Sequence, residues 1–130
     1  MPRDINTILF EICEKDARYD QAAYEFVLEA LSYSQKKFSR PKHVTGKELL
    51  EGIKILLMEQ FGPMTMTVLR HWGIQNTEDF GNIVFNLVDK KVLSKTEDDK
   101  IETFRNVFDF QIVFDKGYSR SLAKKISRLK

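Results

Sequence analysis

The side chains that commonly carry out chemistry are few in this sequence and far apart. Its histidines are His43 and His71, and its one cysteine is Cys13. A zinc site needs several His, Cys or acidic ligands, often at short spacings, and neither histidine has a Cys or another His so placed. A nucleophilic cysteine needs an adjacent base, which no motif near Cys13 supplies. We therefore expect no catalytic residue, no metal and no cofactor.

Two other patterns could bind ions or phosphates. Residues 97–99 (EDD) form an acidic run, but they lack the ligand spacing of a calcium loop, so a solvated turn is the simpler interpretation. The glycines are scattered rather than grouped, and no phosphate-binding loop is predicted. An enzyme with an unrecognised site, for example around Glu59, His71 and Trp72, stays an alternative.

Positive charge is concentrated in two stretches. Residues 116–130 carry six basic side chains and no acid, whereas the rest of the chain carries 15 basic and 19 acidic side chains. A second basic group lies within residues 36–43. If the two stretches lie side by side, they form a footprint for an RNA or DNA backbone; if they lie apart, they are ordinary solvated segments. The candidate contacts to nucleic acid or to a partner are Lys36, Lys37, Arg40, Lys42, His43, Arg120, Lys124, Lys125 and Arg128.

Length and composition are those of a single globular domain. The chain has 130 residues, of which 42% are hydrophobic and 31% charged. Its first residues lack the apolar core of a signal peptide, and no run approaches the roughly 20 apolar residues of a membrane span. We expect a soluble, cytoplasmic protein, with a globular domain over residues 1–115 and a basic tail over residues 116–130. Leu122, Ile126 and Leu129 would share one face if the tail is helical.

These residues need a scaffold, and apolar residues at helical spacing predict two helices within residues 1–40. Asp4 is placed to cap the first helix. The second helix begins after Asp20 and must end before Pro41, because proline disfavours helical geometry in the residue before it.

Three more helices are predicted between residues 45 and 91. A capping box at Thr45 starts the first of them, and a break at Gly62 separates it from the next. The last begins at Asn76 or Thr77.

The apolar period changes after residue 91. Residues 92–96 and 101–110 are predicted to form a β-hairpin, because aromatic side chains alternate along most of the second arm. Residues 111–115 fit either a continued strand or a helical turn that starts at Asp109.

This order of elements resembles a winged helix-turn-helix domain over residues 45–110. The stretch TVLRHWGIQNTEDFGNIVFNLVDKKVL is similar to a positioning helix, a turn at residues 73–74, a recognition helix and the entry to a wing at residues 92–93. The resemblance implies a mainly α fold of the α+β class. An N-terminal helical pair over residues 1–40 would precede a winged-helix-like three-helix unit with a β-hairpin.

The charge of the predicted recognition helix argues against reading DNA. Major-groove helices present Arg, Lys, Asn or Gln to the bases and cations to the phosphates. Here the first basic residues come only at the end of the helix, and the predicted wing turn is acidic. The polar positions of the helix are Glu78, Asp79, Asn82, Asn86 and Asp89.

A second resemblance covers most of residues 20–115. The stretches HVTGKELLEGI, EQFGPM, HWGI, TEDFGNIVFNLV and SKTEDD are similar to an uncharacterised family of small bacterial proteins from planctomycetes and verrucomicrobia. This resemblance implies no function.

Taken together, these patterns favour a non-catalytic protein-interaction or regulatory module on a winged-helix-like scaffold, with another protein as its partner. The alternative is binding of an RNA or DNA backbone through the basic loop 36–43 and the basic tail. Partner identity and oligomeric state do not follow from the sequence.

Overall fold

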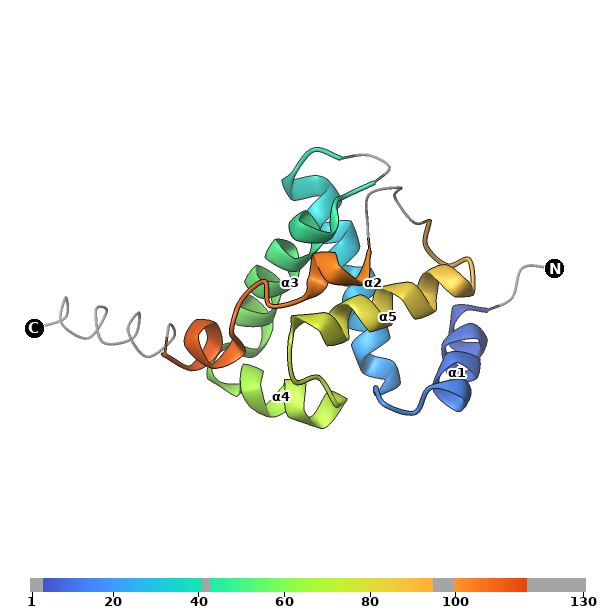
Figure 1. The fold of residues 1–130 in the computed structure, drawn as a ribbon, viewed down its shortest axis with the longest axis horizontal. Helices are drawn as coiled ribbons and strands as arrows, with labels where there is room; N and C mark the ends of the chain where they lie inside the picture. Colours follow the sequence, from blue (N-terminus) through green and yellow to red (C-terminus); the bar gives the residue numbers. More distant parts are fainter. Residues whose placement is uncertain (1–3, 41–42, 95–99, 117–130) are drawn as a thin grey trace, which may run out of the picture.

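The computed structural model describes residues 4–40, 43–94 and 100–116, and every regular element in these residues is helical (Figure 1). The α-helices are α1 (Ile5–Lys15), α2 (Gln21–Lys37), α3 (Gly46–Phe61), α4 (Thr65–Trp72) and α5 (Thr77–Asp89). Short helical turns are η1 (Gly62–Met64), η2 (Ile101–Phe104) and η3 (Gln111–Lys116). In Figure 1, α1 lies at one end of the molecule and η3 at the other.

The predicted helix starts are confirmed by their caps. The carboxylates of Asp4 and Asp20 accept hydrogen bonds from the backbone amides of the first turns of α1 and α2. Thr45 forms a reciprocal capping box with the third residue of α3. For α5, the cap is Asn76 rather than Thr77, because the Asn76 side chain accepts from the amide of Asp79.

The α+β class and the β-hairpin are wrong, because no strand occurs in the described residues. Two backbone turns lie at the expected arms: Lys91, directly before the first, has φ 60°, and Asn106, within the second, has φ 49°, both in the left-handed region. After Lys91, the amide of Val92 donates back to the carbonyl of Leu87 at 2.9 Å, which keeps the chain against α5. Residues 95–96 of the predicted first arm lie outside the described part. The winged-helix resemblance therefore does not extend to a wing.

The alternating phenylalanines have another role. Residues 101–104 form η2, and Phe104 is 1% exposed. A Cβ added to Gly46 of α3 or to Gly81 of α5 would come within about 3 Å of Phe104 side-chain atoms, so its ring fits between the two helices only because both residues are glycine. The Thr77 hydroxyl donates to the Phe104 carbonyl and holds this segment in place. The alternating phenylalanines in the sequence therefore reflect aromatic side chains that anchor an irregular segment, not a β-strand.

Residues 111–115 are predicted to be either a continued strand or a helical turn, and the helical turn is confirmed. The Asp109 carboxylate accepts from the amide of Ile112 at 3.1 Å, as expected for a residue that starts a turn. Phe114 is buried by this turn and packs against Phe110, with ring centroids 5.6 Å apart.

One hydrophobic core joins the α-helices of the described residues with η2 and η3, whereas η1 contributes no buried residue to it. The core extends from Leu9 of α1 to Phe114 of η3. The most extensive contact between two elements is that of α2 with α3. Trp72 lies between Phe26 and Phe61, with ring centroids 5.3 and 5.7 Å away. The core therefore includes residues from both predicted helical units.

Candidate functional site

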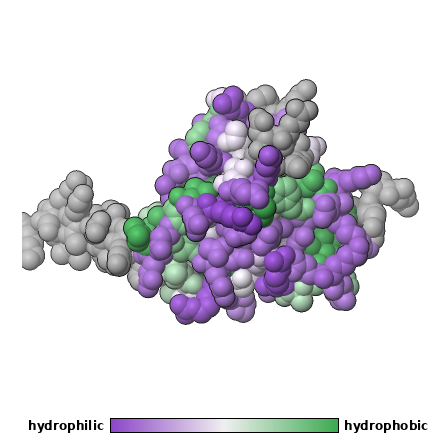
Figure 2. All heavy atoms as spheres, in the orientation of Figure 1, coloured by the Kyte–Doolittle hydropathy of each residue, from purple (hydrophilic) through white to green (hydrophobic). Residues whose placement is uncertain are grey.

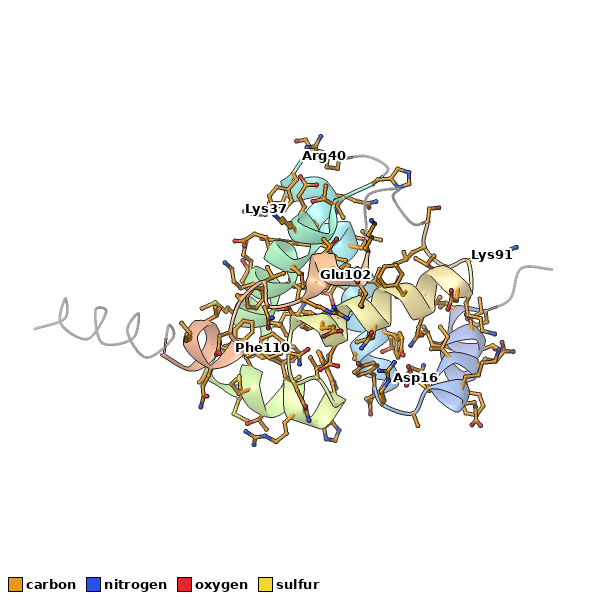
Figure 3. All side chains as sticks on the ribbon, viewed as in Figure 1. Asp16, Lys37, Arg40, Lys91, Glu102 and Phe110 are labelled. Carbon is orange, nitrogen blue, oxygen red and sulfur yellow. The ribbon has the colours of Figure 1, made fainter. Side chains whose placement is uncertain are left out.

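The basic residues expected to bind a partner are only partly described. Lys36 and Lys37 are exposed at the end of α2, and Figure 3 shows Lys37 and Arg40 at the same end of the molecule. Arg40 is an ion-pair partner, because its Nε lies 3.2 Å from Glu48 Oε2. Lys42 and the tail residues Arg120, Lys124, Lys125 and Arg128 lie outside the described residues. Whether loop and tail form one surface thus stays a prediction.

His43 is placed differently from the lysines, because it lines a pocket. The pocket lies between α2, α3, α5 and η2 and has a volume of about 260 Å³. Most of its walls are apolar side chains. Its lining residues are Leu31, Gln35, His43, Val44, Thr45, Gly46, Leu49, Val84, Phe85, Val88, Val92, Leu93, Ser94 and Phe104.

Exposure separates the floor of this pocket from its mouth. Val44, Gly46, Leu49 and Phe104 are buried, whereas the polar residues His43, Thr45 and Ser94 are exposed. The polar groups therefore surround the opening, and the apolar groups form the interior.

Two local features create the pocket. The first is the small size of Gly46, which lets Phe104 approach the start of α3 and face Phe85 edge-on, at 6.3 Å between ring centroids. The second is the turn at Lys91, after which Leu93, like Val92, donates its amide to the Leu87 carbonyl. That turn brings Val92 and Leu93 back beside the outer face of α5.

Sequence reasoning missed this pocket. The winged-helix resemblance places residues 92–93 at the entry to a wing and leaves no role for a second apolar face of α5. The sequence feature that could have indicated the pocket is the width of the apolar face of α5. Val84, Phe85 and Val88 make this face wider than the apolar stripe that packs into the core.

The polar side of α5 faces the loop between α1 and α2. The Tyr19 hydroxyl donates to Asp79 Oδ1 at 2.5 Å and accepts from Asn82 Nδ2 at 2.9 Å. One turn further along, Asn86 Nδ2 donates to Asp16 Oδ2 at 2.9 Å and to the Tyr24 hydroxyl at 3.0 Å. These polar side chains of the predicted recognition helix are thus engaged within the chain.

The same network shifts the titration of its members. The hydrogen bond from Arg18, together with that from Asn86, holds the pKa of Asp16 well below its usual range. Burial and the carboxylate of Asp79 raise the pKa of Tyr19. Burial raises the pKa of Tyr24 to about 12. At neutral pH, Asp16 is therefore charged and both tyrosines keep their protons.

A second surface lies where η1 and η3 touch. We call Met64, Met66, Phe108, Phe110 and Ile112 the end patch. Met64 is 55% and Ile112 is 58% exposed, on elements that contact each other. Met66, Phe108 and the buried Phe110 line an adjoining depression, together with six polar residues. Figure 2 shows hydrophobic atoms at this end of the described molecule, where Figure 1 places η3.

The residues considered for catalysis or metal binding do not converge in the described part of the chain. No group of three or more His, Cys, Asp or Glu that could hold a metal occurs there. Trp72 is buried among phenylalanines, while His71 is exposed and lines a shallow depression that does not include Glu59. Burial raises the pKa of the Cys13 thiol, which makes the thiolate less available.

No described helix is both long enough and apolar enough to cross a membrane. No protein-family model, curated protein or solved structure matches the chain, so neither fold nor function can be taken from a relative.

Proposed function

We propose that this chain is a non-catalytic protein-interaction module and that the end patch is its contact surface. The proposal rests on one observation: two long apolar side chains, Met64 and Ile112, are each more than half exposed on adjacent elements, next to a depression that three apolar and six polar residues line. Large exposed apolar patches on soluble proteins commonly mark interfaces. Methionine suits such a surface because its unbranched side chain adapts to different partners.

The two exposed apolar residues of α1 do not form an equivalent surface. Ile5 and Phe10 both lie on α1, but five residues along a helix correspond to a rotation of about 140° from one side chain to the other. They therefore point to different sides, and Phe10 offers a matched control for the end patch.

Affinity capture from extract of the source cells tests the proposal. We expect the natural protein and the Phe10→Lys variant to retain the same partner. The double variant Met64→Lys and Ile112→Lys should lose it, because the lysines place charges in an apolar interface. Thermal melts should be nearly unchanged, since all three side chains are exposed. Retention of no protein above background, or equal retention by both variants, counts against the proposal.

A second candidate is binding to an RNA or DNA backbone through residues 36–43 and the tail. It is supported by the exposure of neighbouring Lys36 and Lys37 and by the six basic residues in 116–130.

A further inference from the structure

We propose that the pocket between α2, α3, α5 and η2 binds a medium-chain aliphatic carboxylate. The chain would lie among the apolar walls, and the carboxylate would lie at the mouth beside His43. The site shares no lining residue with the end patch, so this inference is independent of the protein-interaction proposal.

The walls favour an aliphatic chain. Branched side chains from three segments surround the space, with Leu31 on α2, Val84 and Val88 on α5, and Val92 and Leu93 after it. All five are only partly buried in the empty pocket. An aliphatic ligand would remove their remaining apolar surface from water, which is the main driving force for binding in such cavities.

The volume limits the length of the chain. A cavity of about 150 Å³ holds a single benzene ring, and pockets for drug-sized ligands begin near about 300 Å³. At about 260 Å³, this pocket falls between the two. It therefore suits a ligand of roughly eight to twelve non-hydrogen atoms, such as octanoate.

The mouth favours a carboxylate over a neutral or cationic head group. His43 and Ser94 can each donate a hydrogen bond from an imidazole or hydroxyl group, whereas the Thr45 hydroxyl is engaged with Glu48 in the capping box of α3. Glu48, which directly precedes the lining residue Leu49, already accepts from the Thr45 amide at 2.9 Å and pairs with Arg40. A ligand carboxylate would therefore meet donors at the opening.

The charged residues next to the pocket lining are also more often basic than acidic, which again favours an anionic ligand. Among the described residues that directly precede or follow a lining residue, four are cationic and two are acidic. They are Lys36, Lys47, Glu48, Asp89, Lys91 and Arg105. Arg105 pairs with Glu78 at 3.1 Å, as Glu48 does with Arg40, and the other four of these residues are three exposed lysines and one exposed acid.

The first experiment compares three eight-carbon ligands by NMR titration of the full chain. Octanoate should shift the backbone amide signals of Gly46, Leu49 and Ser94. It should bind about tenfold more tightly than 1-octanol, because a hydrogen bond to a charged group adds about that factor. Octylamine should bind more weakly than either. The proposal is overturned if octanoate leaves these signals unshifted, or if the alcohol or the amine binds as tightly.

Variants of the pocket make the second experiment. Val88→Trp places an indole in the cavity and should weaken octanoate binding at least about tenfold, whereas Val107→Trp, outside the pocket, should not. His43→Ala should weaken the binding of octanoate while leaving the binding of 1-octanol unaffected. This variant keeps the test decisive if Val88→Trp does not fold. Equal octanoate affinity in His43→Ala and the natural protein refutes the assigned head-group contact. If the NMR shifts caused by octanoate are centred on Met64 and Ile112, the ligand binds at the end patch and not in the pocket, which overturns the proposal.

Discussion

At the closest approach of α2 to α3, Gly52 faces Ser34. A Cβ built on Gly52 would lie 1.9 Å from Ser34 Oγ and 3.2 Å from Ser34 Cβ. Ser34 is fully buried, and its hydroxyl has no hydrogen-bond partner among the described atoms. Both residues must be small because the two helix backbones are close together. Burying the unpartnered Ser34 hydroxyl lowers the stability of the fold.

This contact predicts strong coupling between two substitutions. Gly52→Ala should lower the free energy of unfolding by about 2 kcal/mol, because overpacking outweighs the better helix propensity of alanine. Ser34→Ala alone should be nearly neutral, since it removes an unpartnered buried hydroxyl. In the Ser34→Ala background, Gly52→Ala should cost much less, because the nearest side-chain atom is then the Cβ at 3.2 Å. Urea unfolding of the four proteins measures this coupling, and additive effects would show that the two side chains do not meet.

At the scale of elements, the polar edge of α5 fastens the loop between α1 and α2. Asp16 is central to this joint, because Arg18 Nη2 donates to one of its oxygens at 2.7 Å and Asn86 donates to the same oxygen. The amide of Asp20 also donates to the Trp72 carbonyl at 3.2 Å, so the loop contacts α4 as well. Figure 3 shows Asp16 between α1 and α5.

The lowered pKa of Asp16 predicts a loss of stability in acid. Its folded-state pKa lies below the unfolded value of about 3.9, so its contribution is present above that pH and disappears as the pH falls further. We expect Asp16→Asn to reduce stability at neutral pH by on the order of 1 kcal/mol, because the partner Arg18 is partly screened by solvent.

The measurement is the free energy of unfolding between about pH 2.5 and pH 7. Asp16→Asn should flatten the decline below about pH 4, and Glu14→Gln, at an exposed position on α1, should not alter stability at neutral pH. An unchanged acid slope in Asp16→Asn would show that another carboxylate governs it.

The elements differ in how far the sequence determines them. Helix starts could be predicted because a cap such as Thr45 interacts within four residues. The segment around Phe104 could not, because its conformation depends on Gly46 and Gly81, which come from other helices. Alternating aromatics suit a strand equally well. The pocket was missed for the same reason: it exists only after four separate segments meet.

At the scale of the whole molecule, charge is divided between an acidic body and a basic tail. Residues 1–115 carry 15 basic and 19 acidic side chains, and the last 15 residues carry six basic ones. Such a distribution can bind a polyanion through the tail while the body repels it.

This division predicts salt-sensitive binding to nucleic acid if the second candidate function holds. In gel shifts with a short RNA and a short DNA duplex, Lys36→Glu with Lys37→Glu should weaken binding, as should Lys124→Glu with Lys125→Glu. Affinity should fall steeply between low and moderate salt, because each phosphate contact releases a counterion. Lys15→Glu with Arg70→Glu makes the same change of charge elsewhere on the exposed surface. If all three pairs behave alike, only net charge matters and the proposed loop and tail contacts are wrong.

The position of Phe104 between α3 and α5 also has a consequence for the order of events during synthesis. The ribosome completes the five α-helices of the described residues before it reaches residue 104. Until then, the glycines at 46 and 81 face the space that Phe104 occupies in the finished structure. A nascent chain that ends at α5 therefore lacks the ring that joins its helices, and the floor of the pocket is completed only when the last aromatic segment emerges.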